Sequence, residues 1–307
     1  MTCKLRIGSN REVNQLKAAL AQSFQWLNER GYSLQIKKER LGTYNYLLLS
    51  LQGPGKGSFL REEDMIHIFK YQLAEVLAED ILDGWETELV WRRIDKKYRV
   101  LSEAEKQLLC EKAVDFLKRC NENESLNLLI RFGRKNKITH RIFDHLHSND
   151  VLILDGFINF CLQDYLTEIK FAVELADEEI KNEREYNEFI KLLRYFVDSQ
   201  SPRIFEVHLM VTESGLFYMW DGNGNLLEEQ LVEYYLDDVL DQDINIDDIL
   251  VSILITIAPR RIVVHEAGSV PETESLKIVK KVFVDRIFTC VGCERCDKNP
   301  HLKNSDW

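Results

Sequence analysis

The sequence predicts a helix-rich α+β fold with a small N-terminal βαββ lobe, a central helical region and a C-terminal α/β part. Apolar residues alternate near both ends of the chain, at Tyr44–Leu51 and Arg203–Val211, as they do in half-buried strands. Between Pro54 and Pro202 the chain has no proline, which is typical of a long helical region. The segment Asp155–Ser199 keeps apolar residues at helical spacing for longer than any other, so one of its faces must be buried.

The expected domains follow from these patterns. We expect a small N-terminal α+β lobe at residues 1–57, a helical domain at 58–200 and an α/β domain at 201–307 that ends in a cysteine-rich tail. A chain of 307 residues, of which 45% are hydrophobic, can build cores of this size without disulfides.

The sequence indicates a cytoplasmic protein. Its first residues, MTCKLRIGSN, lack the apolar run and the cleavage site of a signal peptide. In a reducing compartment the seven cysteines would be free thiols rather than a disulfide framework. The longest apolar run, Ile249–Ala258, is too short to cross a bilayer, so we expect no membrane span.

The N-terminal lobe should contain a strand, a helix and two further strands. We expect the first strand at Cys3–Ile7, and the helix between a cap at Asn10 and a stop at Gly31. The two further strands are expected at Tyr32–Lys38 and Tyr44–Leu51. The loop Gly53–Ser58 follows. Its glycines and lysine do not have the spacing of a phosphate-binding loop, so we predict a flexible linker and a domain boundary here.

Three patterns predict the helices of the central region. Acidic residues at Glu62–Asp64 suit the first turn of a helix, and Ser102–Glu105 has the pattern of a capping box. A third helix is expected from Ser125 to His145. We expect Asp155–Ser199 to form two helices, because Lys181–Glu185 offers no apolar anchor between them.

The C-terminal part alternates strands and helices. Turn residues between two apolar stretches predict a β-hairpin at Arg203–Val211 and Leu216–Trp220. The loop Asp221–Asn225 lacks the glycine and the glutamate of a calcium loop, so we predict a tight turn. The expected elements after it are helices at 228–240 and 247–258, a strand at 260–265, a helix at 272–282 and a strand at 285–289 that runs parallel to the strand before it.

A cluster of cysteines follows the last expected strand. Cys290, Cys293 and Cys296 have the spacing C-x-x-C-x-x-C, and His301 lies five residues further on. Thiolates two residues apart can chelate one metal ion, because the tight turn between them points both sulfurs inward. Three cysteines and one histidine would complete a tetrahedral zinc site, which would pin the C-terminus rather than catalyse a reaction.

Other interpretations of this cluster stay open. An iron–sulfur cluster is disfavoured, because Pro300 stands where the fourth cysteine of a ferredoxin motif would be. The C-x-x-C pair could serve in thiol–disulfide chemistry, or the thiols could have no role on a tail with little to bury.

Five other histidines are candidate site residues. His140, His145 and His147 stand near one helix end at spacings that fit no standard ligand set, so we predict surface or capping roles. His208 and His265 both lie in expected strands, where we predict core or edge positions rather than a catalytic pair.

Charge is unevenly distributed along the chain. The net charge of −11 disfavours nonspecific binding of nucleic acid. Residues 92–141 nevertheless hold 14 Lys/Arg against 7 Asp/Glu, and residues 221–248 hold 10 Asp/Glu without a Lys or Arg. Solvated faces that attract each other explain both segments. Trp85 and Trp91 lie beside the basic segment 92–141, so the sequence is also compatible with an aromatic and basic surface that binds nucleic acid.

Two segments carry a family resemblance. DGFINFCLQDYL at 155–166 and EYNEFIKLLRYFVDSQSPRIFEVHL at 185–209 resemble the YtxC-like family of sporulation proteins from endospore-forming Firmicutes. The likeness extends more loosely from Leu60 to Cys296. It implies a bacterial cytoplasmic protein tied to spore formation, and it transfers no catalytic residue.

The function expected from the sequence is non-catalytic. No HExxH, GxSxG, P-loop or paired-carboxylate motif stands in a context that would confirm it, so nothing positive points to an enzyme. We hypothesise a sporulation-associated interaction or regulatory protein with a protein partner. The alternative is a zinc-containing nucleic-acid-associated protein that uses segment 92–141 and the cysteine cluster. A second alternative is an enzyme whose site is scattered over the C-terminal α/β part.

Overall fold

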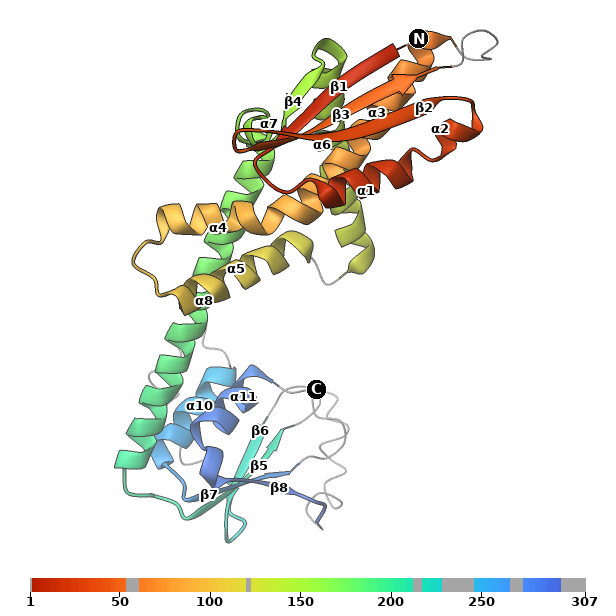
Figure 1. Cartoon of the computed structure of the whole chain (residues 1–307). Helices are drawn as coiled ribbons and strands as arrows, with labels where there is room; N and C mark the ends of the chain where they lie inside the picture. Colours follow the sequence, from red (N-terminus) through yellow and green to blue (C-terminus); the bar gives the residue numbers. More distant parts are fainter. Residues whose placement is uncertain are drawn as a thin grey trace. The chain divides into compact units, whose positions relative to one another are not determined.

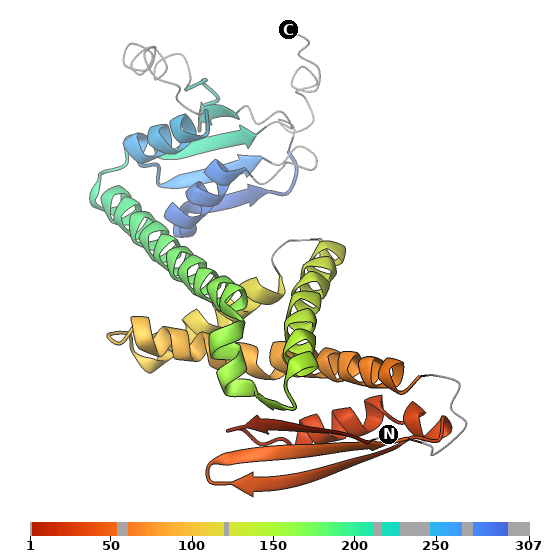
Figure 2. The same cartoon turned by 90° about the horizontal axis from the view of Figure 1, so that it is seen from above.

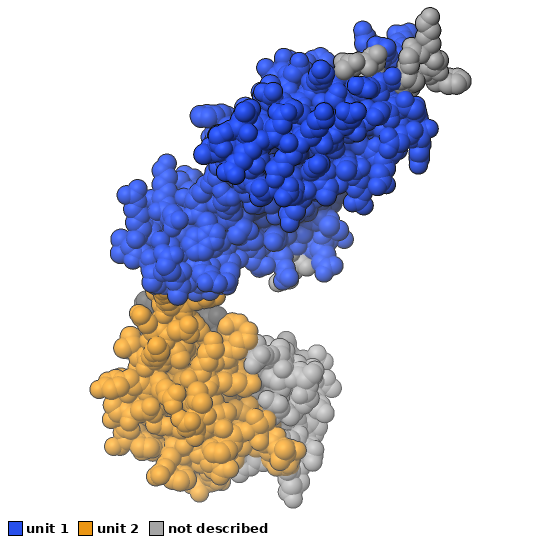
Figure 3. Space-filling view, in the orientation of Figure 1, with its two compact units in different colours: residues 1–181 blue, residues 182–307 orange. Residues whose placement is uncertain are grey.

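The computed structural model describes residues 2–53, 61–119, 123–211, 217–227, 246–265 and 273–293. They form a helix-rich α+β fold, as the sequence predicts (Figure 1). The chain divides into two compact units, residues 1–181 and 182–307 (Figure 3). Each unit has its own four-stranded sheet and its own hydrophobic core. The three-domain division stays a prediction, but the N-terminal lobe and the helices as far as Ile180 share one core.

The sheet of the first unit has the strand order β2-β3-β1-β4. β1 and β2 pair antiparallel with β3, whereas β4 is parallel to β1. The predicted βαββ lobe is therefore confirmed, and a short strand from far downstream, which was not predicted, completes its sheet. The strands are β1 (Thr2–Ser9), β2 (Ser33–Leu41), β3 (Tyr44–Gln52) and β4 (Val151–Ile153).

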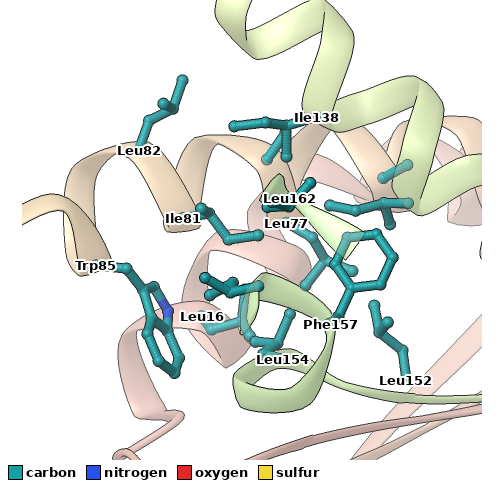
Figure 4. Close-up of a cluster of buried hydrophobic side chains, with 14 of the residues drawn as sticks. Leu16, Leu77, Ile81, Leu82, Trp85, Ile138, Leu152, Leu154, Phe157 and Leu162 are labelled. Carbon is teal, nitrogen blue, oxygen red and sulfur yellow. The ribbon is translucent and has the colours of Figure 1, made fainter. Parts of the chain in front are cut away.

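Helices of the first unit cover one face of this sheet. Figure 2 shows α1 and α3 on the same side of it. Leu16, Leu77 and Phe157 come from three different helices and meet in the buried cluster of Figure 4. The helices are α1 (Asn14–Ser23), α2 (Trp26–Glu29), α3 (Glu62–Asp80), α4 (Glu86–Lys97), α5 (Glu103–Lys118), α6 (Glu124–Ser148), α7 (Leu154–Cys161) and α8 (Gln163–Ser199), with a π-helical segment at Ile81–Trp85 between α3 and α4. The last of them, α8, continues beyond residue 181 into the second unit.

The predicted capping box at α5 is confirmed. The hydroxyl oxygen of Ser102 accepts the backbone N–H of Glu105, and the Glu105 carboxylate accepts the backbone N–H of Ser102. These two bonds satisfy donors that the first turn of a helix otherwise leaves without partners.

Two local predictions are wrong. Asn10 does not cap α1, which begins at Asn14. Instead, the backbone N–H of Asn10 donates to the carboxylate of Asp155 at 3.0 Å. The expected link at Lys181–Glu185 is also absent, because α8 runs through it without a break. That segment consists mostly of good helix formers, and Lys181 pairs with Asp177 one turn earlier at 2.9 Å. The chain breaks at Leu162 instead, between α7 and α8.

The sheet of the second unit has the order β6-β5-β7-β8. β5 and β6 form the predicted antiparallel hairpin, and β5, β7 and β8 run parallel to one another. The predicted parallel arrangement of the last two strands is thus confirmed. The elements are β5 (Glu206–Val211), β6 (Phe217–Asp221), α10 (Ile246–Ile257), β7 (Arg261–His265), α11 (Glu274–Val282), a 3₁₀ turn (Val284–Arg286) and β8 (Ile287–Cys290).

Alternation along the strands separates two faces of this sheet. Leu209 and Ile262 are buried in the core, together with residues of α10 and α11. Successive side chains of a strand point to opposite faces, so His208 and His265 lie on the other face. The carboxylate of Asp221 accepts the backbone N–H groups of Asn223 and Asn225, which confirms the predicted tight turn.

Some expectations lie outside the described residues. These are the helix at 228–240, the linker from Pro54 onwards, Cys296 and His301. Within the described part of the chain, no helix is long and apolar enough to cross a membrane.

Candidate metal centre

Three potential metal ligands meet at the carboxyl ends of two parallel strands. His265 ends β7, and Cys290 ends β8 directly opposite it in the strand register. Cys293 follows three residues later, after Gly292, whose φ of 114° favours glycine. The nitrogen and sulfur ligand atoms of these three side chains all lie within 4.8 Å of one another. The fold therefore gathers one imidazole and two thiols at one point.

The geometry of this cluster fits a tetrahedral metal. Zn–N and Zn–S bond lengths of about 2.0–2.1 and 2.3 Å imply a nitrogen–sulfur separation of about 3.5–3.6 Å at a tetrahedral angle. Nδ1 of His265 and Sγ of Cys293 are 3.6 Å apart. His265 is buried and both cysteines are half-buried, so the ligand atoms are partly shielded from water. These residues suit zinc, which prefers imidazole and thiolate ligands.

A chain of hydrogen bonds fixes the orientation of His265. Oε1 of Glu206 lies 3.0 Å from Nε2 of His208, so this nitrogen carries a proton that it donates to the carboxylate. In a neutral His208, Nδ1 is then the acceptor, and Nε2 of His265 donates to it at 2.9 Å. Nδ1 of His265 is left with its lone pair towards the cysteines. In metal-binding histidines, the ring nitrogen that does not bind the metal commonly donates a hydrogen bond in this way.

Glu206 is itself held in place. Its second carboxylate oxygen lies 3.1 Å from the guanidinium of Arg261, the residue opposite it on β7. The support therefore runs from Arg261 through Glu206 and His208 to His265, and it crosses between β5 and β7 twice.

The structure brings together only part of the predicted ligand set. Cys290 and Cys293 are close together, while Cys296 and His301 lie outside the described residues. The sequence predicts a core or edge position for His265. It is buried, as predicted, but it also faces the cysteines and bonds to His208. The alternation of strand residues around His265 places its side chain on the sheet face that α10 and α11 do not cover. Its position next to Cys290 follows only from the register of β7 and β8.

The histidines of α6 have other surroundings. His140 packs edge-on against Tyr71, and His147 lies beside Phe143. Nε2 of His145 lies 3.1 Å from the carbonyl oxygen of Val151. Among the residues that the structure describes, none of the three belongs to a group of potential metal ligands.

Carboxylates neutralise most of the basic segment 92–141. Of its 14 cations, at least ten lie within 4.0 Å of a carboxylate oxygen: Arg92, Arg93, Lys97, Lys106, Lys112, Arg119, Arg131, Arg134, Lys135 and Arg141. Trp85 is only 2% exposed and lies beneath the guanidinium of Arg11. An aromatic and basic nucleic-acid surface built on Trp85 is therefore not formed here.

Comparison with known proteins finds one matching family and one similar protein. The pattern of the YtxC-like family matches residues 71–288, which is more than half of the chain. YtxC of Bacillus subtilis (strain 168), described as an uncharacterized protein, is 28% identical over 217 residues, which are 69% of this chain and 74% of the relative. No solved structure matches. The family match includes His208 and His265 and ends two residues before Cys290. The chain belongs to the YtxC-like family.

Proposed function

We propose that this chain is a non-catalytic, sporulation-associated interaction protein whose C-terminal unit is held by a structural zinc ion. The observation that carries the zinc site is the cluster of His265, Cys290 and Cys293, whose ligand atoms lie within 4.8 Å of one another. The link to spore formation rests on the resemblance to the YtxC-like family. The expected partner is a protein, and the zinc ion has a structural role rather than a catalytic one.

A zinc ion at this place would fasten the end of the fold. β8 is a short edge strand, paired with β7 through four register positions. Ligands from the ends of both strands would cross-link them where the pairing stops. We propose Cys296 or His301 as the fourth ligand, because both follow Cys293 closely in the sequence. With four protein ligands no coordination position stays open, which is the arrangement of structural zinc sites.

Metal analysis tests this proposal. Protein purified without a metal-binding tag should contain close to one zinc ion per chain, and a Cys293→Ser variant should lose it. Cys161→Ser is the matched control, because Cys161 is a half-buried free thiol of the first unit. Wild-type protein without zinc, or a Cys293→Ser variant with normal zinc content, would contradict the proposal.

A second candidate function has one observation in its favour. A cysteine thiol within reach of an imidazole that a third group orients is the arrangement of an activated nucleophile. Cys293, His265 and His208 have that order. Alkylation separates the two functions, since zinc-bound thiolates react only after a chelator is added. Rapid alkylation of Cys293 without a chelator would favour the nucleophile.

The partner is tested separately. Cross-linking in sporulating cells should join the chain to one defined protein, and the Cys293→Ser variant should lose that product if the zinc-held unit makes the contact. A product that forms equally well in vegetative cells would contradict the sporulation role.

A further inference from the structure

The sheet of the first unit has one face that its helices do not cover. Along β3, Leu47, Leu49 and Leu51 are fully buried under the helices. The alternate residues Tyr44 and Tyr46 are only half-buried, because they point to the other side. Figure 2 shows α1 and α3 on a single side of this sheet. We call the uncovered side the open face.

Strands β1, β2 and β3 supply most of the open face in register, and β4 adds Val151 and Ile153 beside Arg6 and Gly8. Arg6, Leu48 and Lys37 form one row across the sheet, and Lys4, Ser50 and Gln35 form the next row. Tyr46 and Tyr44 continue along β3 from these rows, with Glu39 and Leu41 beside them on β2. The face therefore combines two aromatic rings, three cations and one carboxylate.

The two tyrosines form a continuous aromatic strip. Their ring centroids are 6.3 Å apart, and the guanidinium of Arg6 lies 5.6 Å from the centre of the Tyr46 ring. Gly8 on β1 makes room for this arrangement. A Cβ atom at that position would stand 2.7 Å from the Tyr46 ring, closer than side-chain atoms approach. The Tyr46 ring thus lies against the neighbouring strand.

The cations of the open face are not neutralised by carboxylates of the described residues. Within the described residues, Lys4, Arg6 and Lys37 have no carboxylate within ion-pair distance, whereas at least ten cations of segment 92–141 do. Lys38, the next residue on β2, points to the opposite side and pairs with Glu12 at 2.7 Å. Three cations without a carboxylate partner among the described residues therefore lie on the same face as the tyrosines.

We propose that the open face binds single-stranded RNA. Single strands are bound by aromatic rings that stack on bases and by cations that follow the phosphates, and the open face offers both. Bases would stack on Tyr44 and Tyr46, with phosphates near Lys4, Arg6 and Lys37. Ser50 and Gln35, in the row of Lys4, add a hydroxyl and an amide that can bond to a ribose 2′-hydroxyl. A bond to the 2′-hydroxyl, which DNA lacks, would favour RNA over DNA.

Binding of a fluorescent oligouridine, measured by anisotropy at several salt concentrations, tests this site. Three phosphate contacts predict that log K falls with log salt with a slope of about −2, from about −0.7 per contact for single strands. Tyr46→Ala should weaken binding by about 5- to 150-fold, since one base stack is worth about 1–3 kcal/mol. Lys37→Glu should weaken binding as well and flatten the salt dependence.

Arg40→Glu is the matched control, because Arg40 lies on the same strand but on the opposite face and is exposed. It should bind like the wild type, and since Lys37 and Arg40 are both exposed, both variants should fold normally. Absence of binding at low ionic strength, or equal weakening by Lys37→Glu and Arg40→Glu, would overturn the proposal. Equal affinity for oligothymidine DNA would overturn the choice of RNA.

Discussion

Nε2 of His265 lies 2.9 Å from Nδ1 of His208, and this contact decides which nitrogen of His265 faces Cys293. A neutral His208 can accept a hydrogen bond only at Nδ1, because its Nε2 donates to Glu206. The pair therefore directs a lone pair of His265 towards the thiols, where a metal ion would bind.

His208→Ala should weaken zinc binding by about 10- to 100-fold, the usual cost of removing a partner behind a metal ligand. The cause would be loss of the acceptor that orients His265. His208→Asn should restore most of the affinity, because its side-chain oxygen can take the place of Nδ1. Competition with a chelator measures both variants. Equal affinity for zinc in wild type and His208→Ala would show that the hydrogen bond plays no part in metal binding.

The cysteines should differ strongly in reactivity. Burial raises the pKa of the Cys110 thiol to about 11 and also raises the pKa of Cys3. Because only the thiolate reacts, at about pH 8 roughly one Cys110 in a thousand would be reactive. In zinc-free protein, iodoacetamide should therefore label Cys161, Cys290 and Cys293 well before Cys110. Mass spectrometry of the alkylated peptides measures the order, and early labelling of Cys110 would contradict it.

Glu86 gives the first unit a defined pH dependence. Its carboxyl is buried and accepts the Tyr165 hydroxyl at 3.2 Å, and burial raises its pKa above the ordinary value. A raised folded-state pKa favours the protonated form. Its stabilising contribution is therefore complete below the ordinary pKa and is lost as pH rises through the folded-state pKa.

Glu86→Gln keeps an acceptor for Tyr165 and removes this titration. Relative to the wild type, the variant should gain stability as the pH rises from the ordinary carboxyl pKa through the raised folded-state pKa of Glu86. Urea unfolding at a series of pH values measures the difference. A difference that does not change with pH would rule out this role for Glu86.

The two cores should respond independently to mutation. Leu77 is fully buried in the core of the first unit (Figure 4), so Leu77→Ala should lower the free energy of unfolding of that unit by about 2–5 kcal/mol. The zinc content should not change, because the metal ligands belong to the second unit, which has a separate core. Thermal unfolding and metal analysis of the same sample test both statements. Loss of zinc in Leu77→Ala would mean that the units are coupled.

Local patterns made much of the fold predictable from the sequence. Alternation in Tyr44–Leu51 identified β3, and the capping box at Ser102 fixed the start of α5. The strand Val151–Ile153 was missed because three residues carry too little periodicity, and its place depends on pairing with β1. The continuity of α8 was missed because helix propensity sustained it through a stretch without apolar residues.

The candidate site shows the same limit. The spacing of Cys290 and Cys293 marked them directly, because both ligands lie in one short segment. His265 is 25 residues away from Cys290 in the sequence, and only the parallel register of β7 and β8 brings the two together. The support from Glu206 and His208 likewise depends on the pairing of β5 with β7. Long-range strand register is not visible in the sequence of one chain.

X-ray absorption at the zinc edge tests the central claim most directly, by comparing the wild type with His265→Ala. The wild-type spectrum should show sulfur ligands at about 2.3 Å and a nitrogen ligand at about 2.0–2.1 Å, and His265→Ala should lose a nitrogen ligand or the zinc itself. A shell of oxygen ligands alone, or an identical spectrum in His265→Ala, would contradict a zinc site formed by His265, Cys290 and Cys293.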